Sequence, residues 1–347
     1  MQATFYIYCP AGKVTGGAEL LHQFVDVMNN NNFDARIVYY GKAEHIVPKD
    51  YKKYNIKISE SVEDSPNNVI VLFEGYFKAL EKIKQAKVVL WWLSVDNFYI
   101  CQSGNLDLID AFLFNKKFFI RQIAARCKRI IKKFLFKPTN HILSLKKLAN
   151  DSRIICNAYQ SEYAKDFLER NHFKNLHSLK DYINTDFRYE PSLISQKENV
   201  VIYNPKKGYA FTKKIIGKGN DIKWCPIQNM TRNQVIDTMK HSKVYIDFGY
   251  HPGKDRLPRE AAMSGCCIIT GKLGSAGFYG DIPIDEIKYK FNQSNGDINL
   301  ILSKIHDLLD NYEKRINDFS TYRNAINAEK DEFVNDAIHL AHSLVHL

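Results

Sequence analysis

The chain contains the stretch Gly253-Lys-Asp-Arg-Leu-Pro-Arg-Glu-Ala-Ala-Met-Ser-Gly265 between two short apolar segments, Val244–Phe248 and Cys266–Thr270. Apolar runs of this length on either side of a helical pattern predict two parallel strands joined by a crossover helix. We expect that helix over Pro258–Ser264, because proline is favoured in the first turn of a helix. The loop before it would then lead into a helix N-terminus, where backbone N–H groups and the helix dipole favour an anion.

This stretch is rich in charged side chains. They are Lys254, Asp255, Arg256, Arg259 and Glu260. Basic side chains at a helix N-terminus suit a diphosphate, and a glutamate there can accept hydrogen bonds from the hydroxyls of a ribose. The alternative is a helix cap with solvated charges, and the spacing alone does not separate the two interpretations.

Strand-like and helix-like segments alternate through most of the remaining chain, which is typical of parallel sheets covered by helices. In the first half, the expected strands are Thr4–Cys9, Asp34–Tyr40, Val69–Phe73, Lys87–Leu93, Ala111–Asn115, Arg153–Cys156 and Leu176–Lys180. In the second half, they are Val200–Tyr203, Ile222–Cys225, Val244–Phe248 and Cys266–Thr270. The stretch Asn184–Asn199 shows neither the helical nor the strand period of apolar residues and is the predicted linker. Two doubly wound units would place a cleft beyond the carboxyl ends of their strands.

In order and spacing, Gly253, Pro258, Glu260-Ala-Ala-Met-Ser-Gly265 and Cys266-Cys-Ile-Ile-Thr270 resemble the C-terminal domain of GT-B glycosyltransferases, the group 1 or family 4-like superfamily. The resemblance implies an α/β fold of two Rossmann-like domains facing across a cleft, and a nucleotide-sugar donor whose ribose is held by Glu260. It departs from the pattern of many retaining members at Pro252, where they have a glutamate, and His251 stands beside that position.

The resemblance also implies donor-binding residues outside this stretch. Lys206 and Lys207, in Tyr203-Asn-Pro-Lys-Lys-Gly208, follow the first strand of the second half, where the family often places a basic residue on the phosphates. Ile227 follows the next strand, where the family's backbone meets the nucleobase. Asp255, Arg256 and Arg259 complete the expected donor site. Leu273-Gly-Ser-Ala-Gly277 is similar to the family's glycine loop.

At the other end of the chain, Val14-Thr-Gly-Gly-Ala-Glu-Leu20 follows the first expected strand and opens the first helix. Glycines at positions 16 and 17 permit close approach of a phosphate or a sugar, and the stretch resembles the start of many glycosyltransferases. We therefore expect Gly16 and Gly17 at the donor and Glu19 at the acceptor. A plain glycine turn before a helix is the alternative, and the spacing excludes a dinucleotide fingerprint.

Two carboxylates at strand ends of the first half are candidate catalytic residues, Glu74 and Asp96. An inverting transfer needs a general base within hydrogen-bond reach of the acceptor hydroxyl, whereas a retaining one does not require it. Trp92 offers a ring face to an acceptor sugar, although tryptophans inside a strand more often belong to the core.

The composition excludes several other classes of protein. The 347 residues suffice for two domains, and no apolar run is long enough to span a membrane or to serve as a secretion signal. The seven cysteines are scattered without metal-ligand spacing, and no Asp-x-Asp pair stands at a strand end. We therefore expect a cytoplasmic, metal-independent protein with no cofactor, its nucleotide-sugar being a co-substrate.

The net charge of +11 is concentrated in one segment, 116–150, which carries eleven basic residues and no acidic one. Apolar residues recur there at helical spacing, and a basic amphipathic helix of this kind is typical of anionic membrane surfaces. The residues expected to contact the membrane are Lys128, Arg129, Lys132 and Lys133. A domain helix with a basic outer face is the alternative, and nucleic acid is not an expected partner because no aromatic-basic stacking motif is present.

These patterns together predict a glycosyltransferase that moves a sugar from a nucleotide-sugar to a saccharide or lipid-linked saccharide, as in surface polysaccharide or lipopolysaccharide assembly. The predicted domains are residues 1–190, on the acceptor side, and 199–325, on the donor side, with a helix over 326–347 returning to the first. The location would be the cytoplasm, with peripheral binding to the inner face of the membrane. The alternatives are a GT-B-like epimerase or phosphorylase, or a non-catalytic protein that binds lipid or RNA.

Overall fold

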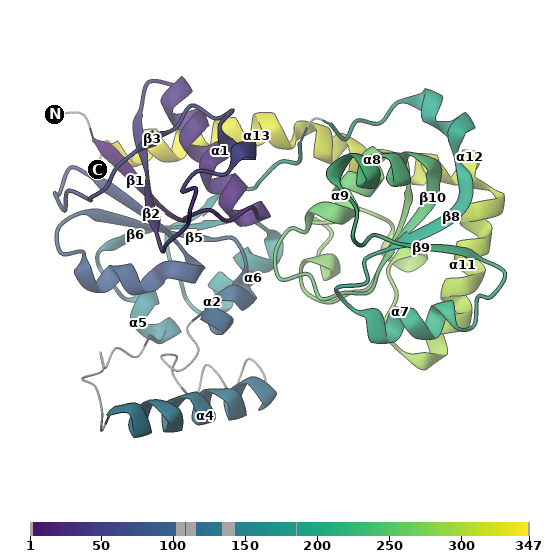
Figure 1. Cartoon of the computed structure of the whole chain (residues 1–347), viewed down its shortest axis with the longest axis horizontal. Helices are drawn as coiled ribbons and strands as arrows, with labels where there is room; N and C mark the ends of the chain where they lie inside the picture. Colours follow the sequence, from purple (N-terminus) through teal and green to yellow (C-terminus); the bar gives the residue numbers. More distant parts are fainter. Residues whose placement is uncertain (1–2, 102–107, 109–115, 134–142, 185, 346–347) are drawn as a thin grey trace. The chain divides into compact units, whose positions relative to one another are not determined.

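The computed structural model of the chain describes residues 3–101, 108, 116–133, 143–184 and 186–345 (Figure 1). The chain forms two compact units. The first unit consists of Met1–Gln160, Ala164–Leu179 and Val334–Leu347, and the second of Ser161–Tyr163 and Lys180–Phe333. The domain boundaries expected from the sequence, which were placed at the predicted linker, stay a prediction.

The first unit is built on a parallel sheet of seven strands in the order β3-β2-β1-β4-β5-β6-β7. The strands are β1 (Thr4–Pro10), β2 (Asp34–Tyr40), β3 (Lys57–Ile58), β4 (Val69–Phe73), β5 (Lys87–Trp92), β6 (Ile154–Tyr159) and β7 (Leu176–Ser178). Six of them confirm sequence-predicted strands, and the two-residue strand β3 was not predicted. The strand expected over 111–115 lies outside the described residues.

Helices of the first unit follow its strands, as a parallel sheet requires. They are α1 (Gly16–Asn30), α2 (Val95–Cys101), α4 (Lys116–Lys133), α5 (Leu145–Ala149), most of α6 (Glu162–Arg170) and the end of α13 (Ser320–Val345). Helix α1 buries the apolar stripe that its sequence predicted, with Leu20, Phe24 and Met28 all at most 1% exposed. The 3.6-residue period of that stripe explains why this segment is a helix.

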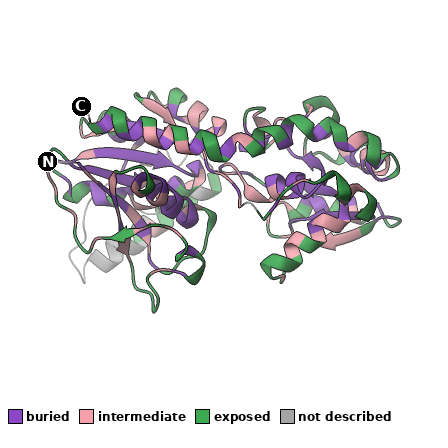
Figure 2. Cartoon of the chain, turned by 90° about the horizontal axis from the view of Figure 1, so that it is seen from above, coloured by how far each residue is buried: buried purple, intermediate pink, exposed green. Residues whose placement is uncertain are grey.

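The second unit is built on a parallel sheet of four strands in the order β11-β10-β8-β9. The strands are β8 (Glu198–Tyr203), β9 (Lys223–Pro226), β10 (Ser242–Asp247) and β11 (Cys267–Thr270). The main helices are α7 (Tyr209–Ile216), α8 (Arg232–His241), α9 (Arg256–Met263), α11 (Ile298–Asp310), α12 (Tyr312–Arg315) and the first part of α13. Both sheets are mostly buried (Figure 2). The predicted architecture of parallel, helix-covered sheets is confirmed.

The predicted linker 184–199 is partly ordered secondary structure. It contains a 3₁₀ helix, Pro191–Gln196, and β8 already begins at Glu198. Between them, the ammonium of Lys197 donates hydrogen bonds to the carbonyl oxygens of Met239, Ser242 and Ser264 at 2.9, 2.8 and 2.7 Å. This lysine therefore joins the ends of α8 and α9 to the start of β10.

All seven cysteines are free thiols. Among the described residues, no helix combines the length and the apolar character that crossing a membrane requires.

Candidate functional site

The charged loop that the sequence singled out lies in the second unit, at the carboxyl end of β10. It leads into α9, which begins at Arg256 and therefore starts two residues before the predicted Pro258. Proline is tolerated at this third helical position because the first N–H groups of a helix have no partner within it. As a consequence Glu260 lies just beyond the first turn rather than in it, and its side chain is half-buried.

Gly208 brings the loop after β8 against the end of β10. Its φ is +62°, and a Cβ atom there would lie 2.1 Å from the carbonyl oxygen of Phe248, so only glycine fits. This close approach places the ammonium of Lys207 2.6 Å from a carboxylate oxygen of Asp255. The neighbouring Lys206 is exposed.

Asp255 occupies the N-cap position of α9, but its side chain makes no capping hydrogen bond to a described N–H group of the helix. N-cap aspartates usually accept such a bond. Here the carboxylate is directed to Lys207 instead.

The glycine loop after β11 has a structural explanation. The backbone N–H of His251 donates to the carbonyl oxygen of Leu273, and the N–H of Ser275 donates to the carbonyl oxygen of His251 at 2.8 Å. A Cβ atom on Gly274, whose φ is +66°, would lie 2.0 Å from that oxygen. Packing against His251 therefore requires this glycine, whatever ligand the loop meets.

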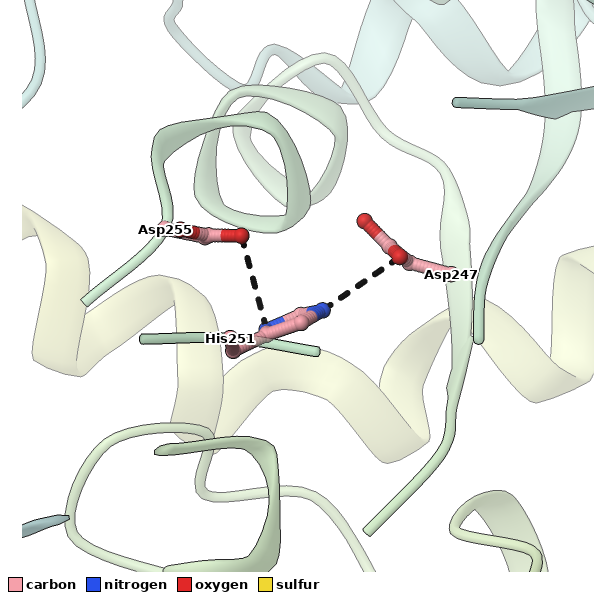
Figure 3. Close-up of side chains that lie close together, drawn as sticks. All are labelled: Asp247, His251 and Asp255. Atoms are coloured by element: carbon pink, nitrogen blue, oxygen red, sulfur yellow. Dashed lines mark ion pairs between the residues drawn. The ribbon is translucent and has the colours of Figure 1, made fainter. Parts of the chain in front are cut away.

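His251 lies between two carboxylates, Asp247 at the end of β10 and Asp255 (Figure 3). Its Nε2 is 3.3 Å from an oxygen of Asp247, and its Nδ1 is 4.0 Å from an oxygen of Asp255. The imidazole is 0% exposed. Burial alone would lower the pKa of His251, but the carboxylate of Asp247, together with that of Asp255, raises it above its usual value. These three residues also lie close enough together to hold a metal ion.

Asp247 is itself well supplied with hydrogen-bond donors. The hydroxyl of Tyr245 donates to one oxygen at 2.7 Å, and the N–H of Gly249 donates to the other at 2.8 Å. Burial alone would raise the pKa of Asp247, but the partners around it, His251 foremost, hold it below its ordinary value.

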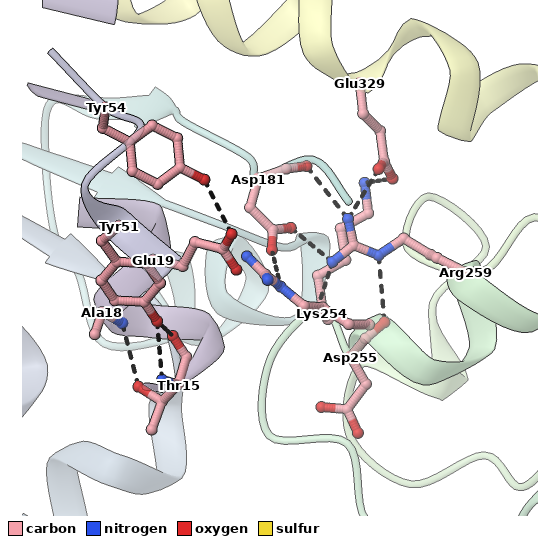
Figure 4. Close-up of polar contacts among 11 residues, drawn as sticks. Thr15, Ala18, Glu19, Tyr51, Tyr54, Asp181, Lys254, Asp255, Arg259 and Glu329 are labelled. Carbon is pink, nitrogen blue, oxygen red and sulfur yellow. Dashed lines mark hydrogen bonds and ion pairs between the residues drawn. The ribbon is translucent and has the colours of Figure 1, made fainter. Parts of the chain in front are cut away.

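Arg259 was predicted to bind the donor phosphates, and the structure gives it a different role (Figure 4). Its guanidinium donates to the carboxylates of Asp181 and Glu329 at 2.7 and 2.9 Å. It also donates to the backbone oxygens of Asp181, Lys254 and Asp255. An arginine has five N–H donors, and all five are used here by a side chain that is 0% exposed. Arg259 therefore has no donor left for a phosphate.

Two further cations join this network. The ammonium of Lys254 lies 2.8 Å from Glu329, and the Nε of Arg256 lies 3.6 Å from Asp181. Burial alone would raise the pKa of Asp181, but the positive charges of Arg259, Arg256 and Lys254 hold it below its usual value. The loop before α9 is thus fixed by buried ion pairs.

Asp181 and Glu329 were not predicted from the sequence. Both are far from the loop along the chain, so no local spacing connects them to it. One sequence feature could have indicated Glu329. It lies on α13 between the buried Ile326 and Phe333, where it interrupts an otherwise apolar stripe. A carboxylate in such a place needs a buried cation as a partner.

Ile227 follows β9 directly and is 9% exposed. Its backbone N–H donates to the carbonyl oxygen of Tyr203 at 2.9 Å. A contact between this backbone and a nucleobase would therefore use the carbonyl oxygen of Ile227.

In the first unit, the glycine pair begins α1 as predicted, with Thr15 as the N-cap residue. The hydroxyl of Tyr51 fixes Thr15, since it accepts from the Thr15 N–H at 3.1 Å and donates to the Thr15 carbonyl oxygen at 3.0 Å (Figure 4). A Cβ atom on Gly17 would come no closer than 3.5 Å to a neighbour, an ordinary contact. Packing within the first unit therefore does not demand a glycine at position 17. Glu19 is 8% exposed and accepts a hydrogen bond from Tyr54 at 2.9 Å.

The candidate catalytic carboxylates of the first unit differ from each other. Glu74 is 1% exposed, and one oxygen accepts the backbone N–H of Leu93 at 2.9 Å. Burial raises the pKa of Glu74 to about 8. A general base must be ionised, whereas burial favours the protonated form of Glu74, and its catalytic role stays a prediction. Asp96 is half-buried in the first turn of α2 and stays a candidate.

Trp92 belongs to the core rather than to an acceptor site. It is 0% exposed, and its ring packs edge-on against Phe77 and Phe173 with centroids 5.1 and 5.3 Å apart. The alternative weighed for tryptophans inside a strand is the correct one here.

The basic segment contains helix α4, as predicted. The side chains of the four residues expected at a membrane, Lys128, Arg129, Lys132 and Lys133, lie outside the described part of the structure. In the described part of α4, Lys116, Lys117 and Arg121 are exposed, and Ile120 and Ile123 are 64% and 40% exposed.

Comparison with solved structures identifies the fold. Over 99% of both chains, the structure is similar to sucrose-phosphate synthase from Thermosynechococcus elongatus, with a TM-score of 0.60 and 10% identity. It is similar to WaaG, a glycosyltransferase involved in lipopolysaccharide biosynthesis, over 98% of this chain and 99% of that one, with a TM-score of 0.52 and 11% identity. An alpha-glucosyltransferase in complex with UDP matches over the full length of both chains with a TM-score of 0.51 and 9% identity.

The chain therefore has the GT-B fold of glycosyltransferases, which confirms the fold expected from the sequence. No protein-family model matches the sequence, and no curated protein matches it either.

Proposed function

We propose that the protein is a glycosyltransferase that uses a nucleotide-sugar donor bound by its second unit. The observation that carries this proposal is the charged loop between β10 and α9, which a GT-B fold places at the carboxyl ends of parallel strands. Ligands of open parallel sheets bind at that edge. The solved structures of the same fold include an alpha-glucosyltransferase with UDP.

Lys207 and Arg256 are the residues proposed to neutralise the diphosphate. The side chain of Lys207 is 37% exposed and that of Arg256 is 19% exposed, so both are accessible to a ligand. Glu260 is proposed to accept hydrogen bonds from the ribose hydroxyls. Arg259 takes no part in binding and instead fixes the loop that carries these residues.

The reaction proposed is displacement of a nucleoside diphosphate from the anomeric carbon of the sugar by an acceptor hydroxyl. The bond from that carbon to the acceptor oxygen forms, the bond to the phosphate oxygen breaks, and the hydroxyl proton leaves the acceptor. Negative charge then develops on the leaving diphosphate, where Lys207 and Arg256 would stabilise it. If the transfer inverts configuration, Asp96 is the candidate that accepts the proton.

The acceptor is proposed to be a saccharide, and more narrowly a lipid-linked saccharide of a surface polysaccharide or lipopolysaccharide. Support for the narrower proposal comes from α4, where exposed Ile120 and Ile123 lie among exposed basic residues. Such a helix suits the anionic inner face of a membrane. Co-sedimentation with anionic and neutral liposomes tests this membrane contact, and we expect the wild-type protein to prefer anionic vesicles. Replacing Lys128, Arg129, Lys132 and Lys133 with glutamine should abolish that preference. An unchanged preference would remove the support for a lipid-linked acceptor.

A thermal-shift panel of UDP-, GDP-, CMP- and dTDP-sugars tests the donor proposal, because a ligand that binds the native state raises the apparent melting temperature. We expect one nucleotide class to give a shift that Lys207→Met reduces strongly. Lys223→Met is the matched control, since Lys223 lies in the same unit, is 69% exposed and pairs with Glu198. If no sugar nucleotide stabilises the wild-type protein, the proposed function is wrong.

A further inference from the structure

Four residues of the second unit form a chain of alternating charge, which we call the His251 cluster: Asp247, His251, Asp255 and Lys207. Asp255 is shared by two side chains, because its oxygen lies 2.6 Å from Lys207 Nζ and 4.0 Å from His251 Nδ1. The other ring nitrogen of His251 faces Asp247 at 3.3 Å. Neither nitrogen of this fully buried ring has a hydrogen-bond partner of normal geometry among the described residues.

The position of the two ring nitrogens favours one charge state of His251. Each faces a carboxylate oxygen, and an ionised carboxylate can only accept. A neutral imidazole has one donor nitrogen and one acceptor nitrogen, so one of its two contacts would be repulsive. The imidazolium has a donor on each side and is attracted by both carboxylates.

The charge of the cluster leads to the same result. Asp247 and Asp255 bring two negative charges and Lys207 one positive charge, so a neutral histidine would leave one negative charge uncompensated. Asp247 is buried, and buried charges are stable only when they are paired. A protonated His251 makes the cluster neutral, and the pKa of His251 is raised despite its burial.

A metal ion is the competing interpretation of these side chains. A bound ion takes one nitrogen of an imidazole, and its ligand atoms converge on one point. In the His251 cluster the two nitrogens face different carboxylates (Figure 3). Lys207 already lies against Asp255. The geometry therefore suits an imidazolium better than a coordinated ion.

We propose that His251 is a positioning residue which, as an imidazolium, shares the carboxylate of Asp255 and thereby leaves Lys207 available to the diphosphate of the donor. This proposal rests on the proposed function of the second unit. When His251 loses its proton, the charge of Asp255 falls on Lys207 alone, and the donor must compete for that ammonium. The affinity for the donor should therefore weaken as the pH rises through the titration of His251.

The charge state is tested first, without any donor. NMR of the histidine ring nitrogens in the full-length, isotope-labelled protein distinguishes an imidazolium from either neutral tautomer. The signal lost in His251→Gln identifies this residue. We expect two protonated nitrogens at neutral pH, and deprotonation above the range of an ordinary histidine. A neutral ring at neutral pH, or a stoichiometric metal ion that disappears in His251→Gln, would overturn the proposal.

The effect on the donor is tested by measuring the dissociation constants of UDP-glucose and GDP-mannose between about pH 6 and about pH 9, the range in which histidines titrate. The phosphates of a sugar nucleotide do not titrate in that range. We expect wild-type affinity to weaken about tenfold across it, a usual size for coupled sites. His251→Gln should bind weakly at every pH.

The control is His306→Gln, which removes a histidine of the same unit that pairs with Asp221 at 2.7 Å on the surface. It should keep the wild-type profile. Lys207→Met provides a second variant, and it should bind weakly with no pH dependence even if His251→Gln fails to fold. Equal pH profiles of wild-type protein and Lys207→Met would overturn the proposal. If no UDP-, GDP-, CMP- or dTDP-sugar binds the wild-type protein or any variant at any pH, the proposed donor site is wrong, while the ring titration still decides the charge state of His251.

Discussion

Both units bury acidic side chains, and they stabilise them in opposite ways. In the first unit, Glu74 follows β4 and is bonded by the backbone N–H of Leu93, and burial raises its pKa to about 8. In the second unit, Asp181 is equally buried, but the cations around it, Arg259 foremost, hold its pKa below the usual value. One acid is neutralised by a proton and the other by guanidinium and ammonium groups.

The difference determines how each unit responds to the loss of a cationic side chain. A protonated carboxyl is a neutral group, so it does not need a buried cation beside it. The loop of the second unit depends on charges whose partners come from distant parts of the chain. Removing one partner of a buried pair leaves an uncompensated charge, which costs more than the pair contributed.

The largest effect should follow from Arg259→Met in the second unit. Asp181 and Glu329 would remain buried without their main partner, and we expect a loss of about 3–5 kcal/mol in the free energy of unfolding. Urea denaturation measures this loss, and peptide-level hydrogen exchange along the denaturation series assigns it to the second unit. Arg232→Met is the matched control, because Arg232 pairs with Asp186 at the surface with side chains 47% and 49% exposed. The control should lose less than about 1 kcal/mol. Equal losses would contradict the role of the buried network.

The second effect is a pH dependence in the first unit. Glu74 binds its proton more tightly when folded, with a pKa of about 8 against an ordinary 4.5. Its contribution to the free energy of unfolding is therefore complete below the ordinary pKa and is lost as the pH rises through about 8. The loss amounts to roughly 1.4 kcal/mol for each unit by which the folded pKa exceeds the ordinary one. Melting temperatures at a series of pH values should fall less steeply for Glu74→Gln than for wild-type protein.

The control for that series is Glu198→Gln, since Glu198 is exposed and its Lys223 partner lowers its pKa. The side chain is charged throughout the range in question, and its variant should keep the wild-type slope. A steep slope that survives in Glu74→Gln would show that another group causes it.

Two glycines give the third comparison. Gly274→Ala should cost about 2 kcal/mol or more, because a Cβ would lie 2.0 Å from the oxygen of His251 at a positive φ. Gly17→Ala should keep or raise stability, since the added Cβ would make only an ordinary contact and alanine favours a helix by up to about 1 kcal/mol. If Gly17 serves a ligand, its variant should instead bind the sugar nucleotide more weakly. Thermal unfolding and donor affinity, measured on both variants, separate a glycine needed for packing from one needed for binding.

The smallest effect should come from Tyr51→Phe in the first unit. The change removes the hydroxyl that fixes Thr15, and neutral hydrogen bonds contribute about 1 kcal/mol each. The exposed Tyr279 offers a control, and Tyr279→Phe should leave stability unchanged. A loss as large as that of Arg259→Met would contradict the contrast between neutral and charged loops.

Most strands could be predicted from the sequence because buried parallel strands are continuous apolar runs bounded by turn residues. Strand β3 could not, since its two residues, Lys57 and Ile58, are exposed and too few to show a period. The start of α9 was placed two residues late because Pro258 was read as the first helical position, and it is the third.

The site was harder to predict than the fold because local sequence shows charge but not its partner. Arg259 and Lys207 look equivalent in the sequence, yet one is fully buried in ion pairs and the other is partly exposed. Glu74 and Asp96 both follow apolar strands, and only burial distinguishes the protonated carboxyl from the half-exposed one. These differences arise from packing between residues far apart in the chain.

The ammonium of Lys197 has a practical consequence. All three of its N–H donors are engaged by carbonyl oxygens, and burial holds its pKa below the ordinary value for a lysine. Amine-reactive reagents need an accessible lone pair, which this nitrogen exposes only when the ends of α8 and α9 separate. The acylation of one peptide, read by mass spectrometry, would then serve as a built-in reporter of whether the second unit is folded.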